Sequence, residues 1–295
     1  QLEQFQGTLR VVPASDVRKS KISSAEEARK NFGATLAVTG SVQGKTDSLR
    51  LTVNLIDTKS LRQLSSFVED YPMASFAKIQ DQTFKKLAGL LEIELQPQVL
   101  RKLAKGGTTV STANVFYLQG LGYLQRYEKP ENIDIAIDLF ENALKKDSLF
   151  SLAYAALGEA YWRKYQSSKD QIWIEQATQN CTQAIKLNNE LPAAYVTLGM
   201  IQTGRGLYKE AVAQFQKALK LDLLNADAYR GLADAYEALG EIKQAEATYK
   251  KAIELRPNYW AGYNNLGKFY SKHGRYSEAV NQFQQVVLLT PDNVR

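Results

Sequence analysis

The chain has 295 residues, a length that suits two domains, or one domain and a solenoid, better than a single compact core. Its apolar content of 44% is enough to bury a core, and its net charge of +6 lacks the clustered basic stripe of a nucleic-acid-binding protein. Cys181 is the only cysteine, which excludes an intramolecular disulfide. The only histidine, His273, has no acidic cluster around it, so we expect a solvated side chain and no metal site. No apolar run approaches the ~20 residues that span a bilayer, so we expect no membrane segment in this sequence.

The first third of the chain does not repeat, and it predicts a small α+β domain with three or more strands and two helices. Strands are expected where the residues form a short apolar run or alternate between apolar and polar. The expected strands are Leu9–Pro13, Ala34–Gln43, Leu49–Ile56 and Gln63–Glu69.

Two helices are expected beside these strands. The first covers Ala25–Asn31, with Ser23 or Ser24 as its N-cap and Gly33 as its end. The second covers Phe76–Leu95, where apolar residues recur at helical spacing.

The string GSVQGKT, from Gly40 to Thr46, looks like a phosphate-binding loop. That motif needs four residues between its glycines, where this chain has three, and a helix after it, where this chain has an alternating strand. We therefore predict a hairpin turn in which Gly44 and Asp47 provide the turn geometry.

Four strings in this region together resemble one bacterial family. They are VVPASDV, ARKNFGATLAVTGSV, LRLTVNLIDTKS and FAKIQDQTFKKLAGLLEIEL, and they resemble the TolB N-terminal-like (FlgO-like) domain in the variant placed directly before tetratricopeptide repeats. The resemblance covers residues 9–95. The family domain normally begins with another strand and helix, and LEQFQG, at residues 2–7, looks like the tail of that first helix. The resemblance implies a truncated domain cut from a larger bacterial protein.

The same resemblance implies a cellular context. Such proteins are commonly membrane-tethered Ser/Thr kinases that carry this module beyond the membrane segment, or adenylate-cyclase-like regulators. We therefore expect an extracytoplasmic or periplasmic location, with a cytoplasmic location as the alternative.

The remainder of the chain is organised by a 34-residue period. Tyr229, Leu232 and Gly240 each recur 34 residues later, at Tyr263, Leu266 and Gly274. The spacing within each unit is helical, the glycine divides the unit into two helices, and the pattern resembles the tetratricopeptide repeat. It implies an all-α, right-handed superhelical solenoid. The expected divisions are 1–97 for the α+β domain, 98–112 for a linker, and 113–293 for five units at 113–150, 151–191, 192–225, 226–259 and 260–293.

Small residues are expected where the helices of a unit cross closely, and Gly158 and Gly267 are two of these positions. A larger side chain there would push the helices apart. Cys181 occupies a position that is aromatic in most repeats, so we interpret it as an inert packing residue.

In tetratricopeptide arrays the first helix of each unit lines a concave groove, and its positions outside the core are free to contact a ligand. This resemblance predicts a groove that changes from apolar to basic toward the C-terminus and binds a peptide with an apolar anchor and an acidic tail. No three consecutive units supply the set of residues that clamps a C-terminal carboxylate in related domains. The expected groove residues are Tyr117, Leu121, Leu124, Glu159, Trp162, Arg163, Val196, Met200, Thr203, Arg230, Asp234, Glu237, Asn264, Lys268 and Lys272.

Two further features are possible contact points. An insertion at Tyr165–Trp173 either projects a loop that presents Trp173 to a partner, or packs Trp173 between the first two units, which we favour. No polar capping helix follows the fifth unit, so we expect self-association or a packing contact at that end.

The function expected from these features is a non-catalytic protein-interaction module, the regulatory or sensory part of a bacterial signalling protein. The sequence has no set of side chains for nucleophilic or metal-assisted chemistry, and we expect no cofactor. Two alternatives remain: an envelope-associated factor that binds carbohydrate or an envelope polymer, and a regulatory domain associated with a cyclase.

Overall fold

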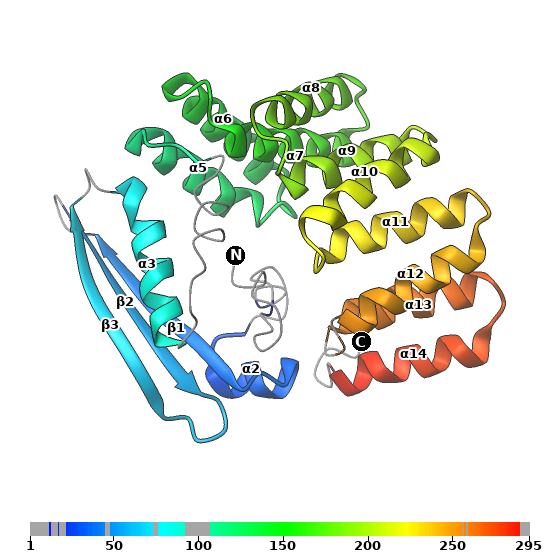
Figure 1. Cartoon of the computed structure of the whole chain (residues 1–295), viewed down its shortest axis with the longest axis horizontal. Helices are drawn as coiled ribbons and strands as arrows, with labels where there is room; N and C mark the ends of the chain where they lie inside the picture. Colours follow the sequence, from blue (N-terminus) through cyan, green and yellow to red (C-terminus); the bar gives the residue numbers. More distant parts are fainter. Residues whose placement is uncertain are drawn as a thin grey trace. The chain divides into compact units, whose positions relative to one another are not determined.

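The computed structural model describes residues 12, 17, 22–44, 48–72, 76–91, 107–255, 257 and 259–289. Within these residues the chain forms a three-stranded antiparallel sheet with two helices near it in sequence, followed by ten helices in a tetratricopeptide-like solenoid (Figure 1). The elements of the first part are α2 (Ala25–Phe32), β1 (Leu36–Gly44), β2 (Ser48–Asp57), β3 (Gln63–Pro72) and α3 (Phe76–Leu90).

The sheet has the strand order β1-β2-β3, so each strand pairs with its neighbour in sequence. The turn between β2 and β3 is held by Asp57, whose Oδ1 accepts hydrogen bonds from the backbone N–H groups of Lys59 (3.0 Å) and Ser60 (2.6 Å). The last three expected strands are therefore confirmed. The expected strand at Leu9–Pro13 lies outside the described residues except for Val12.

The interpretation of Gly40–Thr46 as part of a hairpin is supported by its neighbours, because β2 and not a helix follows it. Gly40 lies inside β1, where an added Cβ would come within 2.3 Å of the carbonyl oxygen of Thr52 on β2. Glycine is required here by close backbone approach, and not by a phosphate. The expected turn residue Asp47 lies outside the described part of the chain.

Helix α2 begins and ends as its sequence predicts. Ser24 is the N-cap: its hydroxyl accepts from the N–H of Glu27 (3.1 Å), and the Glu27 carboxylate accepts from the N–H of Ser24 (3.2 Å). Gly33 ends the helix in the left-handed conformation, with φ of 63°. Helix α3 is tied to β3 through Lys86, which pairs with Glu69 and lies 5.7 Å from the ring centroid of Phe67. The last residues of the expected second helix, 92–95, are not among those described.

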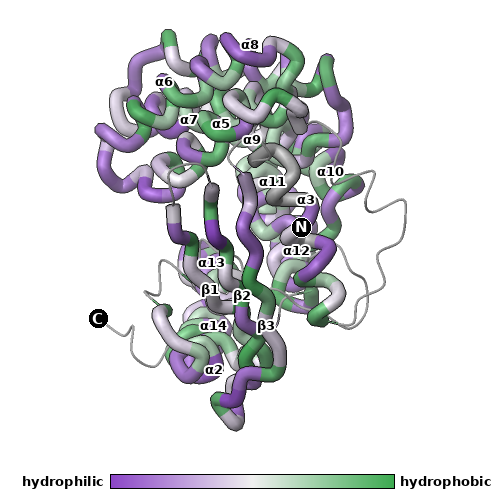
Figure 2. The backbone as a smooth tube through the Cα atoms, turned by 90° about the vertical axis from the view of Figure 1, so that its left-hand side faces the viewer, coloured by the Kyte–Doolittle hydropathy of each residue, from purple (hydrophilic) through white to green (hydrophobic). Residues whose placement is uncertain are grey.

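The ten helices of the solenoid follow one another with short connections, and α5 begins two residues inside the stretch expected to be a linker. Hydrophobic and hydrophilic residues are interspersed along the helices (Figure 2), as expected of helices buried on one side. A division between two compact units falls between Arg205 and Gly206, and we describe the helices on each side separately. The helices are α5 (Ser111–Leu124), α6 (Pro130–Lys146), α7 (Ser151–Ser168), α8 (Ile172–Leu187), α9 (Pro192–Gly204), α10 (Tyr208–Leu221), α11 (Ala226–Ala238), α12 (Ile242–Leu255), α13 (Trp260–Lys272) and α14 (Tyr276–Leu289).

Among α5–α9, close helix crossings depend on glycine. An added Cβ on Gly120 of α5 would lie 2.6 Å from the ring of Phe140 on α6. The same change at Gly158 of α7 would meet the Sγ atom of Cys181 on α8 at 2.4 Å. The predicted close crossing at Gly158 is therefore confirmed, and the fully buried Cys181 is its packing partner.

The helices α10–α14 repeat this arrangement. Phe283 of α14 lies against Gly267 of α13, and Phe215 of α10 lies against Gly231 of α11, with added Cβ atoms at 2.7 Å and 2.3 Å from the two rings. Sequence reasoning anticipated the first of these contacts and missed the second, which joins one repeat to the next. The glycines that separate the helices of a unit, Gly240 among them, have positive φ.

Charged side chains also connect α12, α13 and α14. The carboxylate of Glu246 accepts from Arg275 (2.6 Å) and from the hydroxyl of Tyr270 (2.9 Å), and Arg275 stacks 4.3 Å from the Tyr270 ring centroid. The hydrogen bond from Arg275 is the main reason that the pKa of Glu246 falls to about 2. One carboxylate thus links α12 to α13 and to Arg275, the residue that precedes α14.

We expect Gly158→Ala to lower the free energy of unfolding by about 1–3 kcal/mol, because its methyl group would overlap Cys181. Gly122→Ala is the matched control: it lies in helix α5 with no heavy atom within 4 Å of an added Cβ, so it should be neutral or stabilise by up to about 1 kcal/mol. Urea denaturation followed by circular dichroism measures both changes. Equal effects of the two variants would contradict the close crossing.

Candidate functional site

Of the groove residues expected on α5 and α7, two are buried in the core and the others are partly exposed. The ring centroid of Tyr117 lies 4.9 Å from that of Phe150, and burial raises the pKa of its hydroxyl. Leu121 and Leu124 pack in the same apolar cluster as the buried Trp162. The assignment of Leu124 to a free binding surface was therefore wrong, whereas Tyr117 and Leu121 keep part of their surface exposed.

Trp162 was expected in the groove and is instead buried in the core. It is 6% exposed and stacks on Tyr165 at 5.3 Å between ring centroids. The end of α9 covers it, since an added Cβ on Gly204 would lie 3.1 Å from its ring. On α7 taken alone, Trp162 would point away from the core of its unit. A neighbouring helix covers it, and the periodicity of the α7 sequence does not reveal that contact.

Other expected groove residues in this part of the chain are divided between surface and core. Glu159 and Arg163 pair with each other at 3.2 Å, one turn apart on α7, and the Arg163 guanidinium lies 4.3 Å from the ring centroid of Tyr127. On α9, Val196 is buried, whereas Met200 packs against the core with part of its surface exposed.

Thr203 also makes a contact within its own helix, because its hydroxyl donates to the carbonyl of Gly199 at 2.9 Å.

The insertion in the second unit extends two helices. Trp173 lies in the first turn of α8 and stacks on Tyr161 of α7, with ring centroids 5.6 Å apart and planes 9° from parallel. Lys164 lies 4.1 Å from its ring centroid and pairs with Asp134 of α6. Packing of Trp173 is therefore confirmed: it stacks on its own unit and belongs to a cluster that includes residues of the first unit.

The expected charged residues on α11 and α13 do lie together. Glu237 of α11 is 11% exposed, and its Oε1 lies 2.7 Å from Nζ of Lys272 and 3.1 Å from Nε2 of His273. His273 also packs against Phe269, with ring centroids 4.6 Å apart, and the residue is exposed, as expected. These contacts place the polar faces of two first helices side by side.

The second charged group on α11 surrounds Arg230. Its guanidinium pairs with Asp227 at 3.1 Å and lies 3.9 Å from the carboxylate of Asp234. Burial raises the pKa of Asp234, although the hydroxyl of Tyr249 donates to it and acts in the opposite direction. The same burial and the neighbouring carboxylate raise the pKa of Tyr249, which keeps its proton as the donor.

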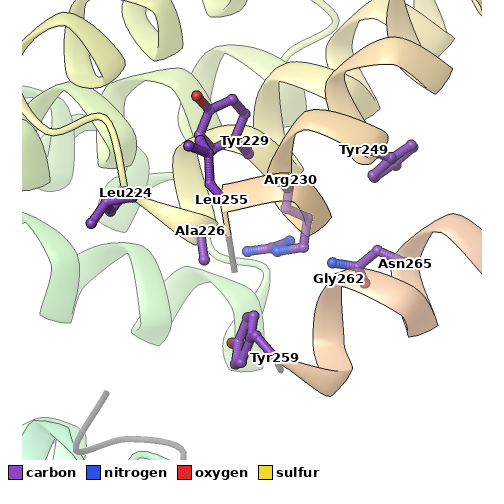
Figure 3. Close-up of a pocket in the computed structure, with 10 residues that line it drawn as sticks. Leu224, Ala226, Tyr229, Arg230, Tyr249, Leu255, Tyr259, Gly262 and Asn265 are labelled. Atoms are coloured by element: carbon purple, nitrogen blue, oxygen red, sulfur yellow. The ribbon is translucent and has the colours of Figure 1, made fainter. Parts of the chain in front are cut away.

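A surface pocket lies beside Arg230 (Figure 3). It is formed by the start of α11, the end of α12 and the start of α13. Leu224, Ala252 and Leu255 contribute apolar surface, whereas Arg230 and Asn265 contribute polar groups. The pocket lies within one compact unit.

Of the expected residues on α13, Lys268 is exposed and Asn264 is half-buried. Sequence reasoning missed the next residue, Asn265, and the pocket residue Tyr259. A signal for Asn265 existed: the corresponding position one period earlier is Gly231, so the exchange of a packing glycine for a carboxamide marks a change of role.

The described part of the chain offers no group of three or more His, Cys, Asp or Glu side chains that could hold a metal ion. Cys181 is buried, and burial raises the pKa of its thiol, which disfavours the reactive thiolate. Among the same residues no helix is both long and apolar enough to cross a membrane.

Comparison with known proteins identifies the repeats. Two family models for the tetratricopeptide repeat match residues 196–260 and 248–281. This part of the chain therefore contains tetratricopeptide repeats. No curated protein matches the chain.

Solved structures resemble the helical part. A thermophilic TPR protein from Thermus thermophilus is 21% identical with a TM-score of 0.51, over 61% of this chain and 93% of its own. PilF of Pseudomonas aeruginosa is 20% identical with a TM-score of 0.50, over 60% and 75%. MamA from Desulfovibrio magneticus RS-1 is 17% identical with a TM-score of 0.47, over 62% and 98%. At these identities the first two similarities establish the fold alone.

We expect Trp162→Ala to lower the free energy of unfolding by about 3–5 kcal/mol, because it empties a buried aromatic site. Arg230→Ala should cost less than about 1 kcal/mol, because its ion pairs are partly exposed. Urea denaturation of the two variants measures the difference. A Trp162→Ala protein as stable as the wild type would return this residue to the binding surface.

Proposed function

We propose that this chain is a non-catalytic protein-interaction module that binds a peptide across the first helices α11 and α13. The observation that carries the proposal is the contact of Glu237 on α11 with Lys272 and His273 on α13. It joins the polar faces of two first helices into one surface beside a pocket, while apolar side chains fill the core. Tetratricopeptide repeats in this region support the proposal.

The sequence favours a peptide with an apolar anchor and an acidic tail. With Trp162 in the core, the apolar anchor would have to bind near α11, where Leu224 and Leu255 line the pocket. The exposed Lys268 on α13 would receive the acidic tail. Lys272 contributes less, because Glu237 already compensates its charge.

We further propose that the module is the regulatory or sensory part of a larger bacterial signalling protein, such as a membrane-tethered Ser/Thr kinase, and that it lies outside the cytoplasm. The four strings that resemble a TolB N-terminal-like domain support this context, and the strands expected from two of them and the helix expected from a third are present. A cyclase-associated regulatory domain and an envelope-polymer binder are the alternatives.

A displayed library of random peptides, selected on the wild-type chain, tests the proposed surface. For the selected peptides, the double variant Arg230→Ala and Lys268→Ala should weaken binding about tenfold in fluorescence anisotropy. Lys209→Ala with Lys243→Ala, two exposed lysines on second helices, is the matched control and should not change the affinity. Equal affinities for both double variants would exclude the α11–α13 surface.

The last described helix supports a second proposal, self-association through α14. Tyr276, Val280 and Val287 form one apolar stripe on this helix and are 67%, 52% and 45% exposed. On the preceding second helix, α12, apolar residues such as Tyr249 and Ile253 are covered by α13. We propose that a second copy of the chain covers the stripe on α14.

Sedimentation velocity over a range of concentrations tests this association. The wild-type chain should show a concentration-dependent dimer, and Val280→Asp should remove it by placing a charge in the apolar stripe. Gln285→Asp adds the same charge on the opposite side of α14 and should leave the dimer intact. A wild-type monomer at all concentrations would refute the proposal.

A further inference from the structure

The pocket beside α11 combines apolar surface with planar polar groups. Leu224 and Leu255 contribute the apolar surface, while the Arg230 guanidinium and the Asn265 carboxamide point toward one another (Figure 3). The ring of Tyr259 also lines the space. Pockets with apolar walls and a few placed polar groups bind small organic molecules.

The charges around this pocket compensate one another. The Arg230 guanidinium lies 3.1 Å from a carboxylate oxygen of Asp227 and 3.9 Å from one of Asp234. An anion in the pocket would meet one guanidinium and two carboxylates, and a cation would meet the guanidinium itself. The pocket therefore favours a neutral ligand.

The Asn265 carboxamide is available to read such a ligand. It makes no hydrogen bond to any described residue, and it offers an acceptor oxygen beside an N–H donor. A carboxamide pairs through both groups with an edge that carries a donor beside an acceptor, as the amino group and ring nitrogen of adenine do.

The Arg230 guanidinium is available in a different way. Among the described residues its one hydrogen bond goes to Asp227, and hydrogen bonds of a guanidinium lie in the plane of the group. The flat faces of the guanidinium are therefore free to stack on an aromatic ring, a contact that arginine makes with nucleobases.

We propose that this pocket binds a neutral, amino-substituted heteroaromatic ring of the adenine type. The Asn265 carboxamide accepts from the amino group and donates to the neighbouring ring nitrogen. The ring stacks on the Arg230 guanidinium, and its apolar edge contacts Leu224 and Leu255. The enclosed volume is about 20 Å³, so one edge of the ring enters the pocket and the rest stays in solvent, which limits the affinity to the millimolar range.

This inference goes beyond the proposed function and does not depend on it. A ring in the pocket takes the space that the apolar anchor of a peptide would occupy, so the two ligands exclude one another. A small molecule would thus regulate the binding of a peptide at the α11–α13 surface.

Titration with nucleosides tests the inference by nuclear magnetic resonance. Adenosine should shift the Asn265 side-chain signals and the Gly262 backbone N–H signal in a saturable way. Purine riboside, which lacks the amino group, should bind about tenfold more weakly because one hydrogen bond is lost. Adenosine monophosphate should bind no more tightly than adenosine. The absence of a saturable shift, equal binding of purine riboside, or tighter binding of the monophosphate would each overturn the proposal.

Three variants separate recognition of the ring edge from a general effect. Asn265→Ala should weaken adenosine about tenfold, and Asn264→Ala, at the half-buried neighbouring position, is the matched control and should bind as the wild type does. Asn265→Asp replaces the donor with a second acceptor. Guanine presents two adjacent donors to such a group and adenine does not, so the ratio of adenosine to guanosine affinity should fall about tenfold. An unchanged ratio, or an equal loss with Asn264→Ala, would contradict the assignment.

Competition distinguishes this inference from the proposed function. Excess adenosine should displace the selected library peptides, and simultaneous binding of both would refute their exclusion. If the peptides bind across Arg230 and Lys268 but adenosine does not bind, this inference fails and the proposed function stands. If adenosine binds and no peptide recognises the surface, the reverse holds.

Discussion

The close approach of helices at glycine is the constraint on which the helical part depends. A ring or a sulfur atom occupies the space that a side chain would take, as Phe140 does at Gly120 and Phe283 does at Gly267. Helices separated by a further methyl group would lose the dense packing that stabilises both faces of the contact. The contact between Gly231 and Phe215 applies the same geometry between neighbouring units. At a fixed spacing along the chain, the repeat therefore places a small residue of one helix against a large side chain of a neighbouring helix.

This packing decides which residues remain available for binding. Trp162 lies at a groove position of its own helix and is nevertheless buried by the end of α9. Arg230, another expected groove residue, lies on α11 and keeps its guanidinium at the edge of a pocket. The difference depends on the first helix of the following unit, because a helix face becomes part of the core when a neighbouring helix covers it.

Electrostatics then limits what the remaining surface can recognise. The sequence predicts a groove that is basic at its C-terminal end. In the structure Glu237 pairs with Lys272 and Asp227 pairs with Arg230, so these positive charges are compensated. Such pairs reduce long-range attraction for acidic partners, so recognition of an acidic tail depends on the exposed Lys268.

The sequence by itself determined the secondary structure and its order. The capping residues of α2, the alternation in β2 and the 34-residue period are local signals, and local hydrogen bonding and side-chain spacing produce them. The strand at Leu9–Pro13 and the tail of the second helix remain predictions. The tertiary structure alone decided that Trp162 is core, that Tyr117 packs against Phe150, that Trp173 stacks on Tyr161, and that Asn265 reaches the pocket beside Arg230. These outcomes depend on contacts between helices, and a periodicity that describes one helix at a time contains no information about the neighbour that covers it.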